Sequence, residues 1–346
     1  MTLRRSVGLL VWLPGFALGM MGCDQPAPSS KPAVPAVSEP RQVSLGREPL
    51  QALPERPGPD RRLVALGRKL FDERRLSADG SVACASCHDL KQGGDDGRAR
   101  SLGIGGRSGL VNAPSVFNAS LNFALFWDGR ASTLEEQIDG PVTNPDEMGS
   151  TWSDVVSKLG SDPEYKQGFA DAFADGITAE NVRRSIAAYE RTLLTHGSPF
   201  DRWLNGESAA LSPAQKTGYE LFKAVGCIAC HQGRNVGGNM FQRFGVLGDY
   251  FKDRGNVSKA DYGRFNVTKI ETDRFVFRVP SLRNVEHTAP YFHDGSAKTL
   301  TQAVQIMAKY QLGRALSEEQ VALLVEFLKS LSGQLPDSVS AKLSGI

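Results

Sequence analysis

The chain has 346 residues, of which 40% are apolar and 23% charged, and its formal net charge is +2. This length is enough for two domains of ordinary size. The near balance of charge gives no indication of a nucleic-acid partner. Five cysteines are present, and four of them fall in two short motifs of the same spacing, so these four are not left for structural disulfides.

Residues 1–23 have the features of an export signal. Arg4 and Arg5 precede an apolar run that Pro14 interrupts and that is too short for a membrane-spanning helix. The run ends at Cys23 in a pattern typical of bacterial lipoproteins, where this cysteine becomes the lipidated first residue. The alternative is ordinary cleavage nearby, with Cys23 removed. In both cases we expect a periplasmic protein, and lipidation would anchor it to a membrane.

Residues 24–59 contain nine prolines, with Ala and Ser between them. This composition predicts a disordered, extended linker that builds no core. We expect ordered structure from Asp60 onward, where Leu63, Leu66 and Leu70 lie on one helical face.

The rest of the chain contains an internal repeat. Residues 114–118 (PSVFN) recur as 280–284 (PSLRN), and residues 126–129 (FWDG) recur as 292–295 (FHDG), at one constant offset. Matching Pro, Asn and Asp-Gly positions at a constant offset indicate two homologous domains. The second domain carries an insertion between its copy of the cysteine motif and residue 280.

Helical periodicity dominates both domains. Apolar residues recur at helical spacing in four segments: 163–174, 179–195, 299–311 and 318–332. Capping boxes at Ser132–Glu135 and Ser317–Gln320 predict helix starts, and strand character is confined mainly to Arg274–Val279. We predict a mainly α fold with few short strands and these parts: an N-terminal domain at 60–200, a C-terminal domain at 201–335 and a tail at 336–346.

Two Cys-x-x-Cys-His motifs, Cys84–His88 and Cys227–His231, each predict one covalently attached c-type haem. Thiols three residues apart reach the two vinyl groups at one haem edge, and the adjacent histidine reaches the iron. A zinc site would have to join cysteines of both motifs and would leave the histidines unexplained. A redox dithiol needs no histidine. The predicted haem-binding residues are Cys84, Cys87, His88, Cys227, Cys230 and His231.

The sequence resembles the bacterial di-haem cytochrome c peroxidases and the related MauG-type enzymes over roughly residues 60–335. The resemblance rests on the two haem motifs and on these segments: residues 112–115, 126–130, Gln137, Glu147-Met148, 280–284, 290–295 and Met307. It implies an enzyme that reduces hydrogen peroxide to water at the N-terminal haem. A small c-type cytochrome or a cupredoxin would deliver electrons to the C-terminal haem. Family members are often homodimers.

The resemblance places Met307 as the distal ligand of the C-terminal haem iron, opposite His231. A thioether favours ferrous iron, so this haem is expected to have the higher potential. A methionine on an apolar helix face is otherwise a core residue. The MauG-type enzymes have tyrosine at this position, and Met307 therefore favours the peroxidase branch.

Four further residues acquire roles from the resemblance. Glu147 and Gln137 correspond to polar residues over the N-terminal haem, where a carboxylate assists peroxide cleavage by moving a proton. Trp127 corresponds to an aromatic residue that relays electrons between the haems, and His293 to a histidine close to the C-terminal haem. Taken alone, Glu147 reads as an exposed acid and Trp127 as a core residue.

The resemblance also implies a calcium ion between the domains. Asn112, Thr288 and Pro290 correspond to its protein ligands. Calcium accepts neutral carbonyl oxygens, so this site needs no carboxylate.

One position departs from the family. Many members carry a histidine in the loop after the first haem motif, and that histidine ligates the N-terminal iron until reduction releases it. Here the matching residue is Ile104, and no other histidine lies between His88 and His196. We expect an N-terminal haem that is five-coordinate or water-bound and needs no reductive activation, unless Met148 becomes a ligand.

Two other functions fit parts of the pattern. A plain di-haem electron carrier would have two six-coordinate haems and no peroxide turnover. A MauG-like oxidase would act on a partner protein, and Met307 argues against it.

Overall fold

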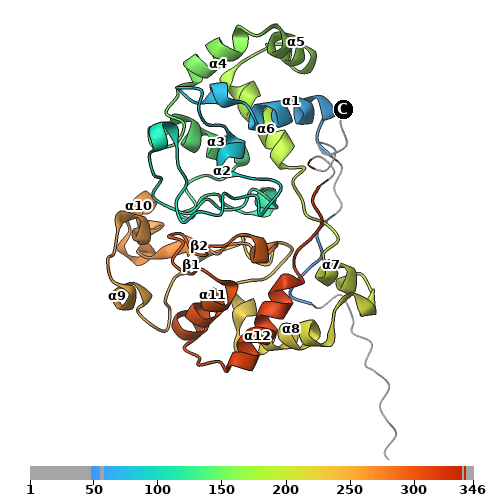
Figure 1. The fold of residues 1–346 in the computed structure, drawn as a ribbon, viewed down its shortest axis with the longest axis vertical. Helices are drawn as coiled ribbons and strands as arrows, with labels where there is room; N and C mark the ends of the chain where they lie inside the picture. The colour runs from blue at the N-terminus through green and yellow to red at the C-terminus, as the bar shows by residue number, and fades with distance from the viewer. Residues whose placement is uncertain (1–47, 55–57, 337–338, 340–346) are drawn as a thin grey trace, which may run out of the picture. The chain divides into compact units, whose positions relative to one another are not determined.

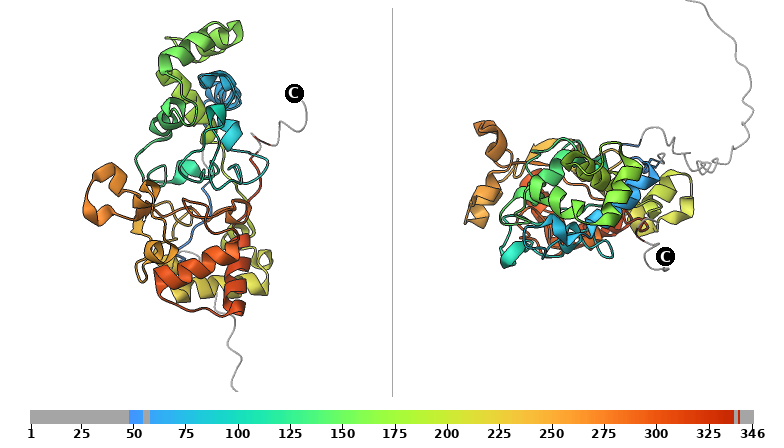
Figure 2. Two further views of the ribbon diagram at one scale, coloured as in Figure 1. Left: turned by 60° about the vertical axis from the view of Figure 1, so that its left-hand side comes forward. Right: turned by 90° about the horizontal axis from the view of Figure 1, so that it is seen from above.

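The computed structural model describes residues 48–54, 58–336 and 339, so the predicted export signal, Cys23 and most of the tail lie outside the described residues. Helices make up most of the regular structure (Figures 1 and 2). Those of the first half are α1 (Arg61–Phe71), α2 (Cys84–Cys87), α3 (Leu134–Thr143), α4 (Trp152–Gly160), α5 (Pro163–Ala172) and α6 (Ala179–Glu190). Those of the second half are α7 (Pro199–Leu204), α8 (Pro213–Val225), α9 (Tyr250–Arg254), α10 (Phe265–Thr268), α11 (Leu300–Ile306) and α12 (Glu318–Lys329).

The strands are few, as the sequence predicts. Strand β1 (Phe241–Arg243) pairs antiparallel with β2 (Val276–Arg278), and Gln242 lies opposite Phe277. The prediction of a mainly α fold is confirmed. Within the described ranges, no helix combines the length and the apolar character that crossing a bilayer requires.

Each half is built on one pair of helices that cross at a glycine. In the first half α1 packs on α6, and in the second α8 packs on α12. A Cβ atom on Gly67 would lie 1.9 Å from the Ser185 carbonyl oxygen, and one on Gly218 would lie 2.1 Å from that of Leu323. Only glycine allows helix backbones to approach this closely. The same contact in both halves supports the repeat seen in the sequence.

The repeat extends to the backbone conformation. Asn118 and Asn284 both adopt the left-handed conformation, with φ of 59° and 57°. Phe126 and Phe292 do so as well, with φ of 64° and 71°. Equivalent bridges and helix N-caps follow at the same offset: Leu125–Ala131 with Tyr291–Ala297, and Thr133 with Thr299.

One predicted helix start is off by a residue. The N-cap of α3 is Thr133, whose hydroxyl accepts from the Glu136 backbone N–H at 3.1 Å. The Glu136 carboxylate accepts from the backbone N–H of Ser132, so the box is shifted by one position from Ser132–Glu135. The box that starts at Ser317 caps α12 as predicted.

The prediction of a disordered linker is wrong for residues 48–54. Leu50 is 1% exposed in the core of the second half and forms a parallel bridge with Gly233. The Gln51 carbonyl accepts from the Arg283 guanidinium at 3.0 Å. Proline content suggested a linker, but apolar side chains of this segment pack into the core of the second half. We call residues 48–54 the strap.

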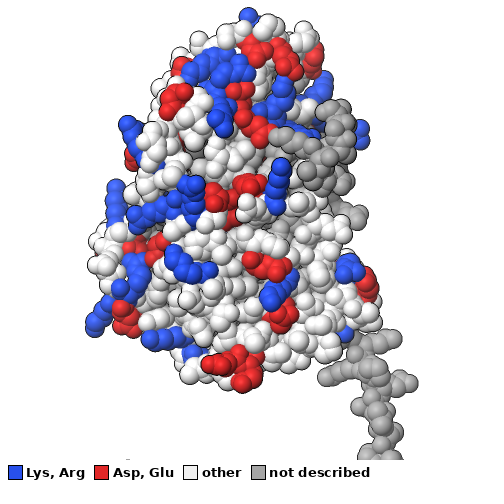
Figure 3. Space-filling view, in the orientation of Figure 1, with Lys and Arg blue, Asp and Glu red and all other residues white. Residues whose placement is uncertain are grey.

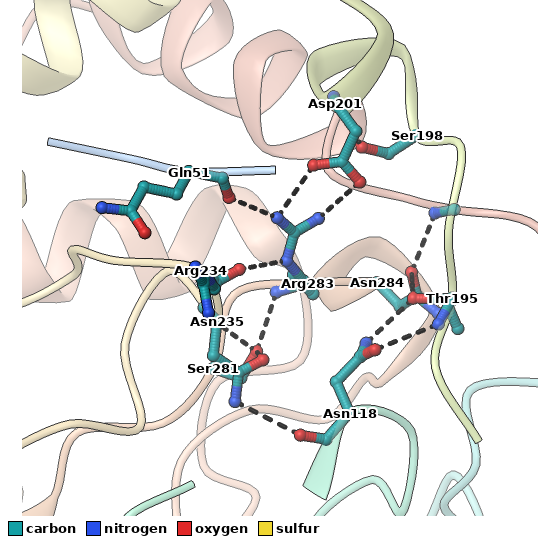
Figure 4. Close-up of polar contacts among 11 residues, drawn as sticks. Gln51, Asn118, Thr195, Ser198, Asp201, Arg234, Asn235, Ser281, Arg283 and Asn284 are labelled. Atoms are coloured by element: carbon teal, nitrogen blue, oxygen red, sulfur yellow. Dashed lines mark hydrogen bonds and ion pairs between the residues drawn. The ribbon is translucent and has the colours of Figure 1, made fainter. Parts of the chain in front are cut away.

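The segment that connects the two halves also bonds to both (Figure 4). The Thr195 hydroxyl accepts from the Asn118 side chain at 2.9 Å and donates to the Asn284 side chain at 3.2 Å. The Asn118 side-chain oxygen accepts from the Thr195 backbone N–H at 3.0 Å. Thr195 therefore joins the two repeat-related asparagines. Beside it, Arg283 donates two hydrogen bonds of 2.9 Å to the buried carboxylate of Asp201.

Charged side chains of both signs are interspersed on the face shown in Figure 3. This agrees with the net charge of +2 and gives no single-sign field over that face.

Candidate haem sites and the groups between them

The first Cys-x-x-Cys-His motif lies on α2, which is a single turn. The turn brings the Cys84 and Cys87 thiols close together, and neither is in a disulfide. The next residue is His88, whose Nδ1 donates to the Gly94 carbonyl at 3.0 Å. Burial lowers the pKa of His88, so its imidazole is neutral at pH 7. With Nδ1 engaged, Nε2 keeps a lone pair for an iron.

The second motif follows α8 directly. Gly226 ends α8 in the left-handed conformation, with φ of 104°, and Cys227 begins a short 3₁₀ turn. The Nδ1 of His231 donates to the Val236 carbonyl at 3.3 Å, and burial lowers the pKa of His231 to about 4. Both histidines are therefore neutral, oriented by a carbonyl and suited to bind iron.

A large, mostly apolar cavity adjoins the second motif. Cys227, Cys230 and His231 line it from one side, and Met307 lines it from another element. Met307 begins a π-helix that spans Met307–Gln311, a distortion that is common at functional sites. The cavity thus places a thioether and an imidazole around a space whose apolar walls fit a haem.

Arg278 provides an independent test of that fit. Its side chain lines the same cavity and the residue is 3% exposed. The guanidinium donates to the Phe126 carbonyl at 3.2 Å and to the Asn122 side chain at 3.3 Å, but none of the described residues offers it a carboxylate within ion-pair distance. Burial lowers its pKa to about 10. Burying an unpaired cation is costly, and a haem propionate in this cavity would supply the missing negative charge.

Glu147 lies near the first motif. Its half-buried carboxylate accepts a hydrogen bond of 2.8 Å from the Asn144 side chain. Burial raises its pKa above the usual range, although Asn144 and the charge of Arg130 oppose this. Burial also raises the pKa of the Cys87 thiol, and Glu147 is close enough to contribute to that increase. The carboxyl therefore lies close enough to Cys87 to act on it electrostatically.

The loop that carries Ile104 is fastened to the Glu147 turn. The Ile104 backbone N–H donates to the Glu147 carbonyl at 2.8 Å, and the Arg107 side chain donates to the Pro145 carbonyl at 2.7 Å. The Ile104 side chain occupies the space beside Gly149, where a Cβ atom would lie 2.5 Å from it. Met148, the alternative ligand, is buried in the core of the first half.

Gln137 lies on α3, half-buried, one residue before the core residue Ile138. Trp127 and His293 lie together, with ring centroids 6.4 Å apart and the rings edge to face. Both line the large cavity. The Trp127 indole N–H donates to the Asn112 carbonyl at 2.9 Å, and the Asn112 backbone N–H donates to the His293 carbonyl at 2.8 Å.

The three residues of the expected calcium site line this cavity as well. Asn112 is buried, and its side-chain nitrogen donates to the Arg98 carbonyl at 2.7 Å, which leaves its side-chain oxygen for another partner. Thr288 and Pro290 approach from the second half. The structure thus brings together residues that are far apart in the sequence.

Buried charged residues near these sites, among them Arg278, Asp261 and Glu190, were not predicted from the sequence. Arg278 is described above. Asp261 contacts His293 from the insertion, and Glu190 is buried at the end of α6. A basic residue close to the repeated Pro-Ser motif was a usable indication for Arg278. No comparable indication existed for Asp261, because the insertion has no counterpart in the first half.

Two cysteine–histidine motifs on repeat-related helical halves, each with a neutral, carbonyl-bound histidine, define a di-haem c-type cytochrome. Residues 61–209 match the protein family "Di-haem cytochrome c peroxidase", and residues 215–332 match the family "Cytochrome c". The chain belongs to the di-haem cytochrome c peroxidase family and is therefore a haem oxidoreductase. This confirms the family that the sequence motifs indicated.

Two curated relatives and one solved structure are similar to this chain over most of its length. It is 47% identical over 287 residues to the cytochrome c peroxidase Ccp of Escherichia coli, which covers 83% of this chain but only 61% of that longer protein. It is 43% identical over 296 residues to the cytochrome c551 peroxidase of Nitrosomonas europaea, covering 85% and 87% of the two chains. The crystal structure of a MauG-like protein associated with microbial copper homeostasis matches with a TM-score of 0.71 at 28% identity, covering 86% and 95%.

Proposed function

We propose that this protein reduces hydrogen peroxide to water at the His88 site, using two electrons from a small c-type cytochrome or a cupredoxin. The observation that carries the proposal is the difference between the two sites. Met307 shares the cavity of His231, which suits a closed electron-transfer haem. Beside the first motif lies the carboxyl of Glu147 instead.

The chemistry divides between the cofactor and the chain. A haem held by His88 would bind peroxide and accept its two oxidising equivalents. Glu147 takes a proton from the near oxygen and delivers it to the departing one, so that peroxide, two electrons and two protons give two waters. Burial, by raising the pKa of Glu147, brings the carboxyl closer to the working pH. Gln137 assists from α3.

Electrons enter at the other site. His231 and Met307 supply the ligand pair that favours reduced iron, and Trp127 relays electrons toward His88. A methionine at position 307 supports this assignment over a MauG-like oxidase, whose family pattern has tyrosine there.

The test of this proposal is Glu147→Gln in the protein with both haems attached. The amide cannot move the proton, so kcat/KM for peroxide should fall by about 10²–10⁴-fold. In the parent protein, kcat/KM should decline as the pH falls through the raised pKa of Glu147, and the variant should lose this dependence. Asp146→Asn is the matched control, because its exposed side chain carries the same charge next to Glu147. Undiminished turnover in Glu147→Gln, or no turnover in the parent, would favour a plain electron carrier.

We further propose that no reductive activation is needed. Isoleucine cannot ligate iron, and the loop that holds Ile104 is already fastened to the Glu147 turn. A protein whose competent state is always populated avoids the loss of activity that a blocking ligand imposes.

Mixing the fully oxidised protein with peroxide tests this second proposal. Ile104→His should introduce an additional low-spin EPR signal and make the reaction depend on prior reduction, whereas Ile104→Leu should behave as the parent. A parent protein that shows only six-coordinate low-spin signals, and that ignores peroxide until reduced, contradicts the proposal.

A calcium ion at Asn112, Thr288 and Pro290 is also proposed. Removal of calcium with a chelator should lower the thermal stability of the holoprotein, and added calcium should restore it. Asn112→Ala should abolish this response. A chelator without effect on stability rejects the site.

We propose that the chain is exported and lipidated at Cys23. The residues concerned lie outside the described structure, and the support is the sequence pattern alone. Mass spectrometry of the mature N-terminus separates the outcomes: a diacylglyceryl cysteine supports lipidation, and a free N-terminus elsewhere rejects it.

A further inference from the structure

The insertion of the second half places a buried ionic cluster behind His293. Asp261 is 1% exposed and accepts from the His293 Nε2 at 2.7 Å. The Arg254 guanidinium bonds to Asp261 through both terminal nitrogens, at 2.9 and 2.8 Å, and also to Asp294. Asp261 and Arg254 both come from the insertion, whereas His293 and Asp294 belong to the repeated part.

The cluster carries a net negative charge. The two carboxylates of Asp261 and Asp294 face the single guanidinium of Arg254, which leaves one unit of negative charge on these three side chains. Burial acts to raise the pKa of Asp261, but hydrogen bonds from His293, Arg254 and Ser258 hold that pKa far below its usual range. Asp261 is therefore ionised although it is buried.

The other side of His293 faces Trp127, the proposed electron relay. Phe277 stacks on the imidazole with ring centroids 4.5 Å apart, and Trp127 meets it edge to face. The Trp127 indole N–H is bonded to the Asn112 carbonyl, which is too weak a base to remove the proton. When Trp127 gives up an electron, the proton stays and the ring becomes a cation.

We propose that Asp261, with Arg254 and Asp294, is a positioning residue that holds His293 against Trp127 and stabilises positive charge on Trp127 during electron transfer. The inference rests on the proposed function, because it requires Trp127 to be oxidised. In each transfer Trp127 gives one electron toward the His88 site and receives one from the His231 side, so it ends unchanged.

The magnitude follows from the charge and the environment. A unit charge about 10 Å away, at the effective dielectric of roughly 20 that suits protein interiors, changes an equilibrium by about tenfold. Arg278 is buried nearby, and its backbone N–H bonds to the Trp127 carbonyl. In the holoprotein a haem propionate would pair with its guanidinium, so the acidic cluster keeps its effect on Trp127.

The experiment compares Asp261→Asn with the parent, both with two haems attached. After rapid mixing with peroxide and freezing, the tryptophan radical signal in EPR should be about tenfold weaker or shorter-lived in the variant. The rate of electron transfer between the haems should fall in parallel. Asp273→Asn is the matched control, because it removes the same charge from the same insertion without contact to His293.

Asp294→Asn is a second variant that keeps the test valid if Asp261→Asn fails to fold. It removes one negative charge but keeps the bond from His293 to Asp261, and it should weaken the radical signal in the same direction. In a Trp127→Phe background, Asp261→Asn should change the transfer rate no further. A parent that lacks peroxide turnover rejects the proposed function. The inference alone is rejected if the parent protein turns over peroxide but Asp261→Asn and Asp294→Asn show the same radical yield and the same electron-transfer rate as the parent.

Discussion

Glu190 is 6% exposed at the end of α6, and its Oε2 has no hydrogen-bond partner within the described residues. Burial raises its pKa to about 8. The folded state therefore keeps the proton over a range, from about pH 4.5 to 8, in which the unfolded chain has lost it. Stability attributable to this group is full below that range and declines as the pH rises through it.

Glu190→Gln should remove this loss of stability at high pH. The melting temperature of the variant should match that of the parent at pH 5 and exceed it at pH 9 by on the order of 5 °C. Thermal unfolding followed by circular dichroism at both pH values measures the difference. Glu180→Gln, which removes an exposed carboxylate from the same helix, serves as control. An equal shift at both pH values would mean that the effect is not one of ionisation.

Single residues also show how far sequence reasoning reached. The haem cysteines and histidines followed from spacing alone, because attachment chemistry requires that spacing. In the structure Met307 lines the His231 cavity and Glu147 is close enough to Cys87 to affect its pKa, and the roles that the resemblance implies for both residues stay predictions. Asp261 could not be predicted, because its partner His293 lies far along the chain and an isolated aspartate in an insertion carries no pattern.

At the scale of elements, the helix crossings depend on glycine. Gly67→Ala should force α1 away from α6, because the added Cβ has no space beside the Ser185 carbonyl. Overpacking of this kind costs about 1–3 kcal/mol and outweighs the gain in helix propensity. Chemical denaturation of the holoprotein measures the loss.

Gly160→Ala is the matched control for that prediction. Gly160 ends α4, and no atom lies within 4 Å of the Cβ position there. This variant should gain up to about 1 kcal/mol. If both variants gain stability, α1 and α6 do not cross as closely as described.

Helix positions were predicted well where amphipathic spacing was long, as for α5, α6 and α12. The predicted segment 299–311 is divided between α11 and the π-helix that begins at Met307. Hydrophobic spacing does not distinguish a short π-helix from the α-helix before it, because only the backbone hydrogen bonds change, from i→i+4 to i→i+5. The shifted start of α3 has a similar cause, because Ser132 and Thr133 are both good N-caps.

For the whole molecule, Thr195 joins the repeat-related asparagines of the two halves. Thr195→Val should leave the buried Asn118 side-chain nitrogen without a partner, at a cost of about 1–3 kcal/mol, whereas the Asn284 side-chain oxygen loses one bond and keeps the one from the Gly333 backbone N–H. Scanning calorimetry should show a lower melting temperature and a transition that begins to separate into two. Thr217→Val, which affects only an exposed hydroxyl on α8, should leave the transition single. Unchanged cooperativity in Thr195→Val would show that the contacts of Arg278 and Asn112 with the opposite half are sufficient to couple the halves.

The repeat told us that the chain has two related halves, but nothing in the sequence showed how they contact each other. That information lies in side chains such as Thr195, which belong to neither copy. The insertion is similar, since its function depends on what it meets in the folded molecule.

The strap has a consequence for the order in which the molecule is made. Leu50 precedes the whole first half in the chain, so it also emerges first during the proposed export, whereas its partner Gly233 follows that half. The strap therefore has no partner to pack against while the first half folds, and it docks only when the second half is complete. Docking of the strap is therefore a late step of folding, and a chain shortened to the first half cannot complete it.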